Sequence, residues 1–347
     1  MHITHVNFAN GFRGGERQTL NLAEGLAQLA VPQLLVCKPG SELEQRARAA
    51  GIAVKAIGHP LTGHLGNIAT SLIHVHEARA AYWTLIEHVL RGTPYLITRR
   101  IPNPVSGSAA NRLVYRRAAR LIGVSHDVAR RLQGQAGREV GVVLDSCTAL
   151  AVDAERTRAI RTELGGGPVI GHVGALHDHH KGQSILIAAF QKLTRHYPDA
   201  RLVLLGEGPD RPAFQKQALG DPRIVFAGFQ QDVGSWLAAF DVFAFPSREE
   251  GLGSSVLDAM SLGVPVVSAA VGGLPELVGA DERGLMVNSV DPEPWSAALR
   301  RMLEDASLRA RLRDAAQVFA AAHDTAAMTR QYVALYEEII SRRAASA

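Results

Sequence analysis

Two acids lie eight positions apart in the segment SREEGLGSSVLDAMSLGVPVVS, which covers residues 247–268. Glu250 precedes a Gly-Leu-Gly triplet, and Asp258 lies within the apolar run that follows. The residues VFAFPS before them predict a buried strand, and SSVLDAMSLG predicts a helix. In open parallel sheets, ligands bind where strands end and helices begin. The segment therefore has the position and the composition of a ligand site.

This segment combines an anion site with two carboxylates. The N–H groups of Ser254 and Ser255 open the predicted helix and can hold a phosphate. A glycine such as Gly253 lets a ligand approach the backbone closely. Carboxylates repel a phosphate but accept hydrogen bonds from neighbouring sugar hydroxyls. Two alternatives stay open: Asp258 could form a capping box with Ser255, and Glu250 could be an ordinary loop acid.

Short β-branched runs alternate with amphipathic stretches along the chain. In the first half we predict strands at residues 3–8, 33–38, 53–58, 71–76, 95–100, 120–125 and 140–145. In the second half we predict them at residues 168–174, 200–206, 224–229, 242–246 and 265–270. Helical patterns lie between them, for example at 15–29, 80–90 and 109–118. This order predicts an α/β fold with two doubly wound parallel-sheet domains covered by helices.

The boundary between the two domains is predicted near residues 147–167, where a polar helix precedes a Gly-Gly-Gly-Pro run. We expect an N-terminal Rossmann-like domain over residues 1–150 and a C-terminal domain over 166–325. The pattern of residues 306–345 predicts two helices at the end of the sequence. The last of them, over residues 326–347, is expected to pack back toward the N-terminal domain.

Composition limits the class of protein. The chain has 347 residues, a net charge of +4 and 5% aromatic residues, and no motif that reads DNA or RNA is visible, so no nucleic-acid partner is predicted. Cys37 and Cys147 lie far apart in apolar runs, as expected of core residues in a reducing compartment. The N-terminus does not resemble a signal peptide, and no run of about 18 apolar residues occurs. The expected location is the cytoplasm.

The segment at 247–268 resembles the signature of family 4 glycosyltransferases, which have the GT-B fold with two domains facing a cleft. In that signature an acid, a Gly-x-Gly triplet and a second acid precede a helix and a buried GVPVV strand. The family usually has Glu at the second acid, so Asp258 is one methylene shorter. The resemblance implies that Glu250 binds the donor sugar near the reacting centre and Asp258 binds the ribose. The amides of Ser254 and Ser255 would then meet the diphosphate.

The resemblance extends over nearly the whole chain. Residues 12–26 look like the family's Gly-rich first loop and helix, so Gly14 and Gly15 would line the cleft. SLIHVHEA resembles the strand whose final histidine, His76, faces the donor sugar, and His76 is accordingly predicted to be catalytic with Glu250. The competing interpretation of His76 is a strand-end histidine with a local partner. His74 is expected to point the other way, as a core or edge residue.

GHVGALHDHHKG resembles the first strand and loop of the donor domain, with Gly174 at the strand end. Lys181 matches the lysine that reaches the diphosphate. The family usually has Arg directly after the Val-Gly pair, and Ala175 stands there instead. Either Lys181 acts with the helix ends alone, or the missing cation is compensated by a histidine of the same loop, namely His177, His179 or His180. These histidines lack a distant acid or Cys pair, so no metal site is predicted.

Two further segments match the family. Residues 228–247 match the segment where the backbone at Gly228 and Phe229 meets the nucleotide base. GGLPELV at 272–278 matches the next loop of the cleft, and a plain Gly-Gly turn is its alternative.

The resemblance implies a retaining, metal-independent glycosyltransferase with no cofactor. Its donor would be a nucleotide sugar, with a UDP-sugar favoured and GDP- or ADP-sugars as alternatives. Lys181 and the helix amides would stabilise the leaving diphosphate. The acceptor would be a cell-envelope glycolipid or polysaccharide precursor, as in lipopolysaccharide biosynthesis. A GT-B nucleotide-sugar epimerase and a non-catalytic sugar-nucleotide binding protein remain alternatives, whereas a dehydrogenase is disfavoured because GFRGGERQ lacks the G-x-G-x-x-G spacing.

Positive charge is concentrated in the N-terminal half, where residues 91–138 contain ten arginines and one acid, Asp127. Arg112, Arg116 and Arg120 recur every four residues, so those of them that lie on one helix share a face of that helix. This region is either a solvated basic surface or a dock for an anionic membrane leaflet or a phosphorylated glycolipid. The predicted acceptor or membrane residues are Arg99, Arg100, Arg112, Arg116 and Arg117. The protein would then be peripheral on the inner face of the plasma membrane.

Overall fold

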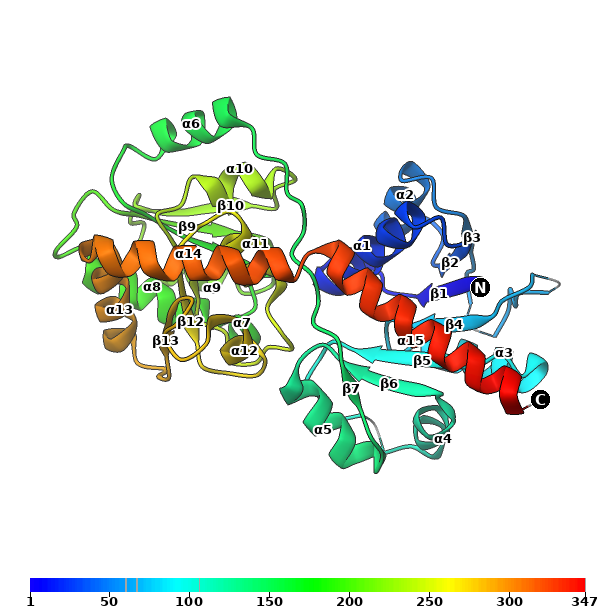
Figure 1. Cartoon of the computed structure of the whole chain (residues 1–347). Coiled ribbons are helices and arrows are strands. Elements are labelled where there is room, and N and C mark those ends of the chain that lie inside the picture. Colours follow the sequence, from blue (N-terminus) through cyan, green and yellow to red (C-terminus); the bar gives the residue numbers. More distant parts are fainter. Residues whose placement is uncertain (60, 67, 106, 347) are drawn as a thin grey trace. The chain divides into compact units, whose positions relative to one another are not determined.

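The computed structural model describes residues 1–59, 61–66, 68–105 and 107–346, and Figure 1 shows the chain as a ribbon. The chain divides into two compact units. Unit 1 comprises Met1–Ser146 and His323–Ala347, and unit 2 comprises Cys147–Ala322. The chain therefore crosses between the units twice, and the segment 147–165 belongs to unit 2.

Unit 1 contains a seven-stranded parallel sheet with the order β3-β2-β1-β4-β5-β6-β7. Its strands are β1 (Ile3–Asn7), β2 (Gln33–Cys37), β3 (Val54–Ala56), β4 (Leu72–Val75), β5 (Tyr95–Arg99), β6 (Arg120–Gly123) and β7 (Gly141–Val142). Its helices are α1 (Gly14–Gln28), α2 (Glu42–Ala49), α3 (Ala80–Arg91), α4 (Ala109–Arg117), α5 (His126–Ala136) and α15 (Thr325–Ser346).

The two faces of this sheet are buried by different helices, because successive strand residues point to opposite sides. One face packs against α3, and its core contains Val6, Val36, Ile73, Ile97 and Trp83. The other face packs against α1 and α15, and its core contains Ile3, Leu72, Leu22, Leu26, Tyr332 and Tyr336. Helix α15 thus packs within unit 1, although it lies at the end of the sequence.

Unit 2 contains a six-stranded parallel sheet with the order β10-β9-β8-β11-β12-β13. Its strands are β8 (Val169–Val173), β9 (Arg201–Leu205), β10 (Ile224–Gly228), β11 (Val242–Phe245), β12 (Val266–Ala269) and β13 (Leu285–Val287). Its helices are α6 (Ala154–Glu163), α7 (Asp178–Lys181), α8 (Gln183–Leu193), α9 (Arg211–Gln217), α10 (Val233–Ala238), α11 (Ser254–Ser261), α12 (Leu274–Val278), α13 (Pro292–Glu304) and α14 (Ala306–Ala322).

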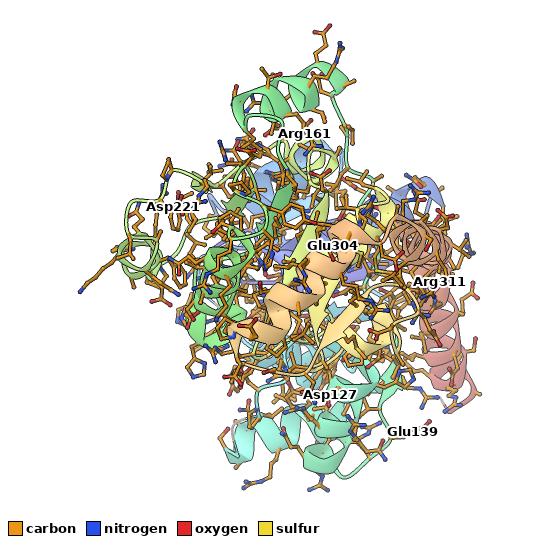
Figure 2. The ribbon with its side chains drawn as sticks, turned by 90° about the vertical axis from the view of Figure 1, so that its left-hand side faces the viewer. Asp127, Glu139, Arg161, Asp221, Glu304 and Arg311 are labelled. Atoms are coloured by element: carbon orange, nitrogen blue, oxygen red, sulfur yellow. The ribbon has the colours of Figure 1, made fainter. Side chains whose placement is uncertain are left out.

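An ion pair attaches α6 to the sheet of unit 2. Arg161, labelled in Figure 2, donates to both carboxylate oxygens of Asp241 at 2.6 and 3.0 Å. Asp241 in turn accepts the Val169 N–H at the start of β8 at 2.8 Å. This bidentate contact explains why the polar helix belongs to unit 2 instead of forming a separate linker.

The two doubly wound parallel sheets confirm the predicted fold class. Each predicted strand is present, with ends within about two residues except for β7, which ends three residues earlier than predicted. The strand β13 was not predicted, because its run Leu-Met-Val is only three residues long. Within the described residues, no helix combines the length and the apolar character needed to cross a bilayer.

Candidate functional site

The order of strands reverses between β8 and β11 in unit 2. In doubly wound sheets this reversal marks the place where ligands bind, outside the carboxyl ends of the strands. Lys181 is the last residue of α7, the short helix after β8, and Glu250 lies in the loop that follows β11. The fold therefore brings Lys181 and Glu250 together at the strand reversal of unit 2.

Lys181 and Glu250 form an ion pair, in which the Lys181 ammonium donates to Glu250 Oε2. Their side chains are 23% and 15% exposed. The Lys181 Nζ also lies 4.9 Å from the centre of the Phe245 ring, a cation–π contact. The other Glu250 oxygen accepts the Gly251 N–H at 3.2 Å. The pair is thus positioned by the protein and still reachable from solvent.

Two glycines permit the close approach of the loops that carry this pair. Gly182 has φ of 63°, and a Cβ there would lie 2.2 Å from the carbonyl oxygen of Pro246. Gly272 has φ of 55°, and a Cβ there would lie 1.9 Å from the Glu250 carbonyl oxygen. Both obstacles are backbone atoms, so a larger residue would force the loops apart. The Gly-Gly pair at 272 therefore supports the Glu250 loop directly.

Helix α11 begins directly after this loop. Gly253 is its N-cap residue with φ of 97°, and no side chain caps the first turn. Ser254 and Ser255 are the first two helical residues and are half-buried. The first N–H groups of a helix have no partner within it, so this end offers donors and a positive dipole. The capping-box interpretation is wrong, because Ser255 lies inside the helix and not at its N-cap.

Asp258 lies on α11 and is 3% exposed. Its Oδ1 accepts the backbone N–H of Thr148 at 2.8 Å. This acid therefore holds the segment through which the chain enters unit 2, a role that no pattern in the sequence predicts.

The loop after β10 has the backbone form expected for close contact with a ligand. Gly228 has φ of 70°, and a Cβ there would lie 2.8 Å from Glu207 Oε1. The ring of the next residue, Phe229, is 58% exposed. Gln230 fixes the turn by donating to the carbonyl oxygen of Ala227 at 2.6 Å.

The histidines near Ala175 do not supply a clear replacement for the missing arginine. His180 Nδ1 lies 3.3 Å from Glu249 Oε2, and both side chains are nearly half exposed.

His172 on β8 was not singled out from the sequence, yet it is fully buried beside Gly174. Its Nδ1 pairs with the Ala244 carbonyl oxygen at 2.9 Å, and burial lowers its pKa to about 4. It is a neutral histidine that joins neighbouring strands.

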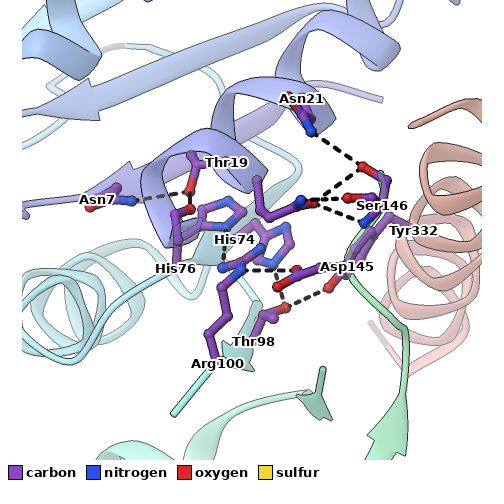
Figure 3. A network of polar contacts seen from close by, with 12 residues as sticks. Asn7, Thr19, Asn21, His74, His76, Thr98, Arg100, Asp145, Ser146 and Tyr332 are labelled. Carbon is purple, nitrogen blue, oxygen red and sulfur yellow. Dashed lines mark hydrogen bonds and ion pairs between the residues drawn. The ribbon is translucent and has the colours of Figure 1, made fainter. Parts of the chain in front are cut away.

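In unit 1 the strand order reverses between β1 and β4. Gly14 and Gly15 form the first turn of α1, after β1, and His76 directly follows β4. Asn7 at the end of β1 donates to Thr19 at 3.0 Å, and the Thr19 hydroxyl donates to the Gly15 carbonyl oxygen at 2.9 Å. These bonds fix the Gly-rich turn at the end of the sheet, and Figure 3 shows the first of them, between Asn7 and Thr19.

His76 is 4% exposed, and both of its ring nitrogens have partners. Arg100 Nη1 lies 3.2 Å from its Nδ1, and His5 Nδ1 lies 2.9 Å from its Nε2. Because a guanidinium can only donate, Nδ1 of His76 is the acceptor and Nε2 carries the proton. That proton is donated to His5, so the interpretation of His76 as a strand-end histidine with local partners fits this geometry.

His74 lies on the same side of β4 as His76, with ring centres 3.9 Å apart. The prediction that it points the other way is wrong, because residues two apart on a strand share a face. Its Nδ1 pairs with the Tyr336 hydroxyl at 2.6 Å and its Nε2 with the Thr98 hydroxyl at 2.8 Å. Figure 3 shows how the Thr98 hydroxyl continues this network to Tyr332.

Three histidines of this cluster, namely His5, His74 and His76, have ring nitrogens within 4.8 Å of one another and could in geometry hold a metal ion. Burial and mutual repulsion hold the pKa of His74 and of His76 well below the usual range, and burial lowers that of His5 to about 3. The guanidinium of Arg100 points at one of the nitrogens and would repel a cation. The donor set therefore fits a neutral hydrogen-bonded network better than a metal site.

Arg99 and Arg100, predicted as acceptor or membrane residues, are largely buried and are not part of the exposed basic surface on α4. Arg99 is 9% exposed and donates to the carbonyl oxygens of Ile101 and Asn103 at 3.2 and 2.6 Å. Arg100 pairs with Asp145 at 3.1 Å, and both side chains are less than 10% exposed. Burial raises the pKa of the Asp145 carboxyl, and Arg100 opposes this shift.

Most other arginines of this region are exposed, whereas Arg120 and Arg138 are half-buried. Arg112, Arg116 and Arg117 lie on α4 beside Leu113, which is 43% exposed. Arg120 lies outside that helix, at the start of β6, and pairs with Glu338 of α15. Asp127, labelled in Figure 2, accepts from Arg130 at 2.6 Å and Arg131 at 2.7 Å. The surface on α4 is thus basic, with an apolar residue among the arginines.

Comparison with known proteins gives a consistent class. Residues 167–305 match the family described as glycosyl transferases, group 1. The chain is 29% identical over 323 residues to the lipopolysaccharide core biosynthesis glycosyltransferase LpsE of Rhizobium meliloti, covering 90% of this chain and 92% of the relative. It is 30% identical to the 2-deoxystreptamine glucosyltransferase of Streptomyces kanamyceticus over 74% of this chain and 65% of that relative.

Solved structures agree on the fold. The structure of Anabaena HepE in complex with UDP and glucose superposes with a TM-score of 0.85 at 21% identity, covering 97% of this chain and all of the other. The family match and these relatives support a group 1 glycosyltransferase, and the chain has the GT-B fold.

Proposed function

We propose that the chain is a retaining glycosyltransferase of family 4 that takes its sugar from a nucleotide-diphosphate sugar. The observation that carries this proposal is the Lys181–Glu250 pair at the strand reversal of unit 2, beside the uncapped start of α11. A UDP-sugar is the favoured donor, which is supported by the UDP and glucose bound to HepE.

The ion pair suggests how the donor enters. A diphosphate carries more negative charge than one carboxylate, so it would draw the Lys181 ammonium away from Glu250. The amides of Ser254 and Ser255 would bind the same diphosphate at the helix end. Glu250, released from Lys181, would then face the sugar and accept its hydroxyls. Donor binding would thus exchange an internal ion pair for two contacts with the ligand.

Charge stabilisation would supply the catalysis. As the bond to the sugar breaks, negative charge grows on the leaving diphosphate, where Lys181 and the helix amides are already in place. Positive character grows at the anomeric carbon, which Glu250 would stabilise. Attack by the acceptor on the same face gives retention and needs no dedicated base. The diphosphate charge is met by protein groups, so we propose that the reaction needs no metal.

We propose the remaining donor contacts from the resemblance to the family. The backbone at Gly228 and Phe229 would meet the base, and Asp258 would bind the ribose. Gly174 would allow the diphosphate to approach the end of β8. In unit 1, Gly14 and Gly15 would offer the free amides of the first turn of α1. For His76 the internal hydrogen bonds favour a positioning role over direct contact with the sugar.

We propose a cell-envelope glycolipid or polysaccharide precursor as the acceptor, an idea supported by the match to LpsE. The exposed arginines on α4, with Leu113 among them, would hold the protein to the inner face of an anionic membrane. Each basic residue near such a surface contributes roughly 1 kcal/mol, and salt screens this attraction. Binding to anionic liposomes should fall between low and high salt, and equal binding of the Arg112, Arg116 and Arg117 triple Ser variant would contradict this surface.

The test is incubation of the purified chain with UDP-, GDP- and ADP-sugars, with and without a lipopolysaccharide core acceptor and with excess chelator. We expect transfer from a UDP-sugar that requires the acceptor, survives the chelator and keeps the anomeric configuration, read by NMR. Turnover of the donor to an epimer without acceptor would favour an epimerase. Binding with neither transfer nor hydrolysis would favour a binding protein. An inverted product would exclude the retaining mechanism.

A further inference from the structure

The two segments that connect the units lie beside one another. The chain leaves unit 1 after Ser146 and returns to it after Ala322. Within unit 1, Ser146 Oγ lies 3.3 Å from Thr325 Oγ1. Within unit 2, Cys147 Sγ donates to the Ala320 carbonyl oxygen at 3.5 Å. The first connecting segment therefore contacts the second once within unit 1 and once within unit 2.

A buried glutamine holds the unit 1 side of the first crossing. Gln18 of α1 donates to the Ser146 carbonyl oxygen at 2.7 Å and accepts the Ser146 N–H at 3.0 Å. Its side chain has no exposed surface. Both polar groups of this peptide segment are thus satisfied by one amide, which fixes the chain where it leaves the sheet.

A buried carboxylate holds the unit 2 side, only two residues later. Asp258 Oδ1 accepts the Thr148 N–H at 2.8 Å, a bond strengthened by the charge of the acceptor. Asp258 lies on α11, one turn after the amides of Ser254 and Ser255. The helix that begins at the candidate diphosphate site therefore also anchors the connecting segment.

We propose that Asp258 couples nucleotide binding in unit 2 to the segment that follows the first crossing. The inference rests on the proposed function, because a ribose hydroxyl of the nucleotide is taken as the second partner of the Asp258 carboxylate. An ionised carboxylate has about four acceptor positions, so it can hold the Thr148 N–H and a hydroxyl together. Each partner fixes the carboxylate for the other. The coupling is therefore positive and acts in both directions.

Hydrogen exchange of the Thr148 amide tests this coupling, with UDP as the probe and the full chain labelled with ¹⁵N-threonine. In the wild type, saturating UDP should slow the exchange by about tenfold, a typical coupling between two sites. Asp258→Ala should exchange faster without UDP and should show no slowing with it. Asp258→Asn keeps a carbonyl acceptor of the same shape, so it should keep part of the protection in the free protein.

Gln18→Ala is the matched control, because it removes the clamp on the unit 1 side and leaves Asp258 in place. The slowing caused by UDP should persist in this variant. UDP binding without slower exchange in the wild type would overturn the coupling and leave the donor site intact. Equal slowing in Asp258→Ala would overturn it as well. If UDP does not bind the wild type, the donor site itself fails, and faster exchange in free Asp258→Ala would then support the anchor alone.

Discussion

Both units place a cation and a carboxylate near the point where the strand order reverses, but they use the pair differently. In unit 1, Arg100 and Asp145 are 8% and 9% exposed, and Arg100 also donates to His76. In unit 2, Lys181 and Glu250 are 23% and 15% exposed. Arginine offers a rigid fork for several fixed acceptors, whereas lysine is a point charge on a flexible stem. The comparison teaches that similar charges are enclosed by the protein in unit 1 and reachable from solvent in unit 2, as the proposed ligand exchange requires.

The cost of disturbing each pair should differ accordingly. Removing one partner of a buried pair leaves a charge without compensation, which is strongly destabilising. A partly exposed pair is screened by water, so its loss affects stability much less. Substitutions in the ion pair of unit 1 should therefore lower the stability of the protein, whereas substitutions in the ion pair of unit 2 should change ligand binding and turnover.

The largest expected effect is on stability in unit 1. Arg100→Ala leaves Asp145 buried without its cation, so the free energy of unfolding should fall by about 3–5 kcal/mol. Urea unfolding of the purified variant measures this loss. Lys181→Ala is the matched control and should change stability by less than about 1 kcal/mol. Equal losses in the two variants would break the distinction between the pairs.

Turnover in unit 2 should respond next most strongly. Glu250→Gln removes the charge that we propose stabilises the anomeric carbon, so kcat should fall about a hundredfold, equivalent to about 2.7 kcal/mol. The melting temperature should hardly change, because a loop acid contributes little packing. Steady-state kinetics with a UDP-sugar measure the effect. A variant with wild-type kcat would remove Glu250 from the catalytic group.

Stability should also fall with acid because of the buried histidines. The lowered pKa values of His5 and His172 mean that the folded state binds fewer protons than the unfolded state. The contribution of these histidines to the free energy of unfolding is therefore fully present above the unfolded pKa of about 6.5, and it is lost as the pH falls below that value. Each such histidine should remove about 1 kcal/mol of stability between pH 6.5 and 5.5, and the slope should approach about 1.4 kcal/mol per pH unit below that range.

His172→Gln isolates one of these contributions. Urea unfolding at pH 6.5 and 5.5 should show a shallower dependence on pH in this variant than in the wild type. The same slope in both proteins would mean that His172 is not a neutral buried group. The cluster in unit 1 should keep most of the remaining slope, since it holds three such histidines.

The smallest expected effect concerns Ala175, where the family that the sequence resembles usually has arginine. Ala175→Arg should strengthen UDP binding by at most about tenfold, because Lys181 already supplies a cation at this loop. Titration calorimetry measures the change. A large loss of affinity would show that this loop follows a different path around the ligand.

The alternation of apolar strands and amphipathic helices was enough to predict both sheets. The glycines, serines and Glu250 could be placed at a strand end from the sequence alone. The partners of these residues could not, because they come from distant segments. Lys181 meets Glu250 across 69 positions, and Arg100 meets Asp145 across 45. The burial of Arg99 depends on a local loop whose carbonyl groups turn toward it, which no pattern in the sequence reveals.

The His5 cluster illustrates the same limit. A single histidine on a strand gives no signal of a partner, and the three rings meet only because β1 and β4 are neighbours in the sheet. The contact of Asp258 with Thr148 was hidden as well, since the spacing of Asp258 from Ser255 suggested a cap. Its contact with Thr148 spans 110 positions. Such pairings depend on topology, which sequence patterns predict less well than the elements themselves.

The most direct test of the account is calorimetric titration of UDP into the wild type, Lys181→Ala and Glu250→Gln. If the diphosphate takes Lys181 from Glu250, Lys181→Ala should bind UDP about tenfold more weakly, equivalent to about 1.4 kcal/mol. Glu250→Gln should bind UDP as tightly as the wild type or more tightly, because its lysine is already released, although its turnover is low. A similar loss of affinity in both variants would contradict the exchange of ion pairs on which the proposed mechanism depends.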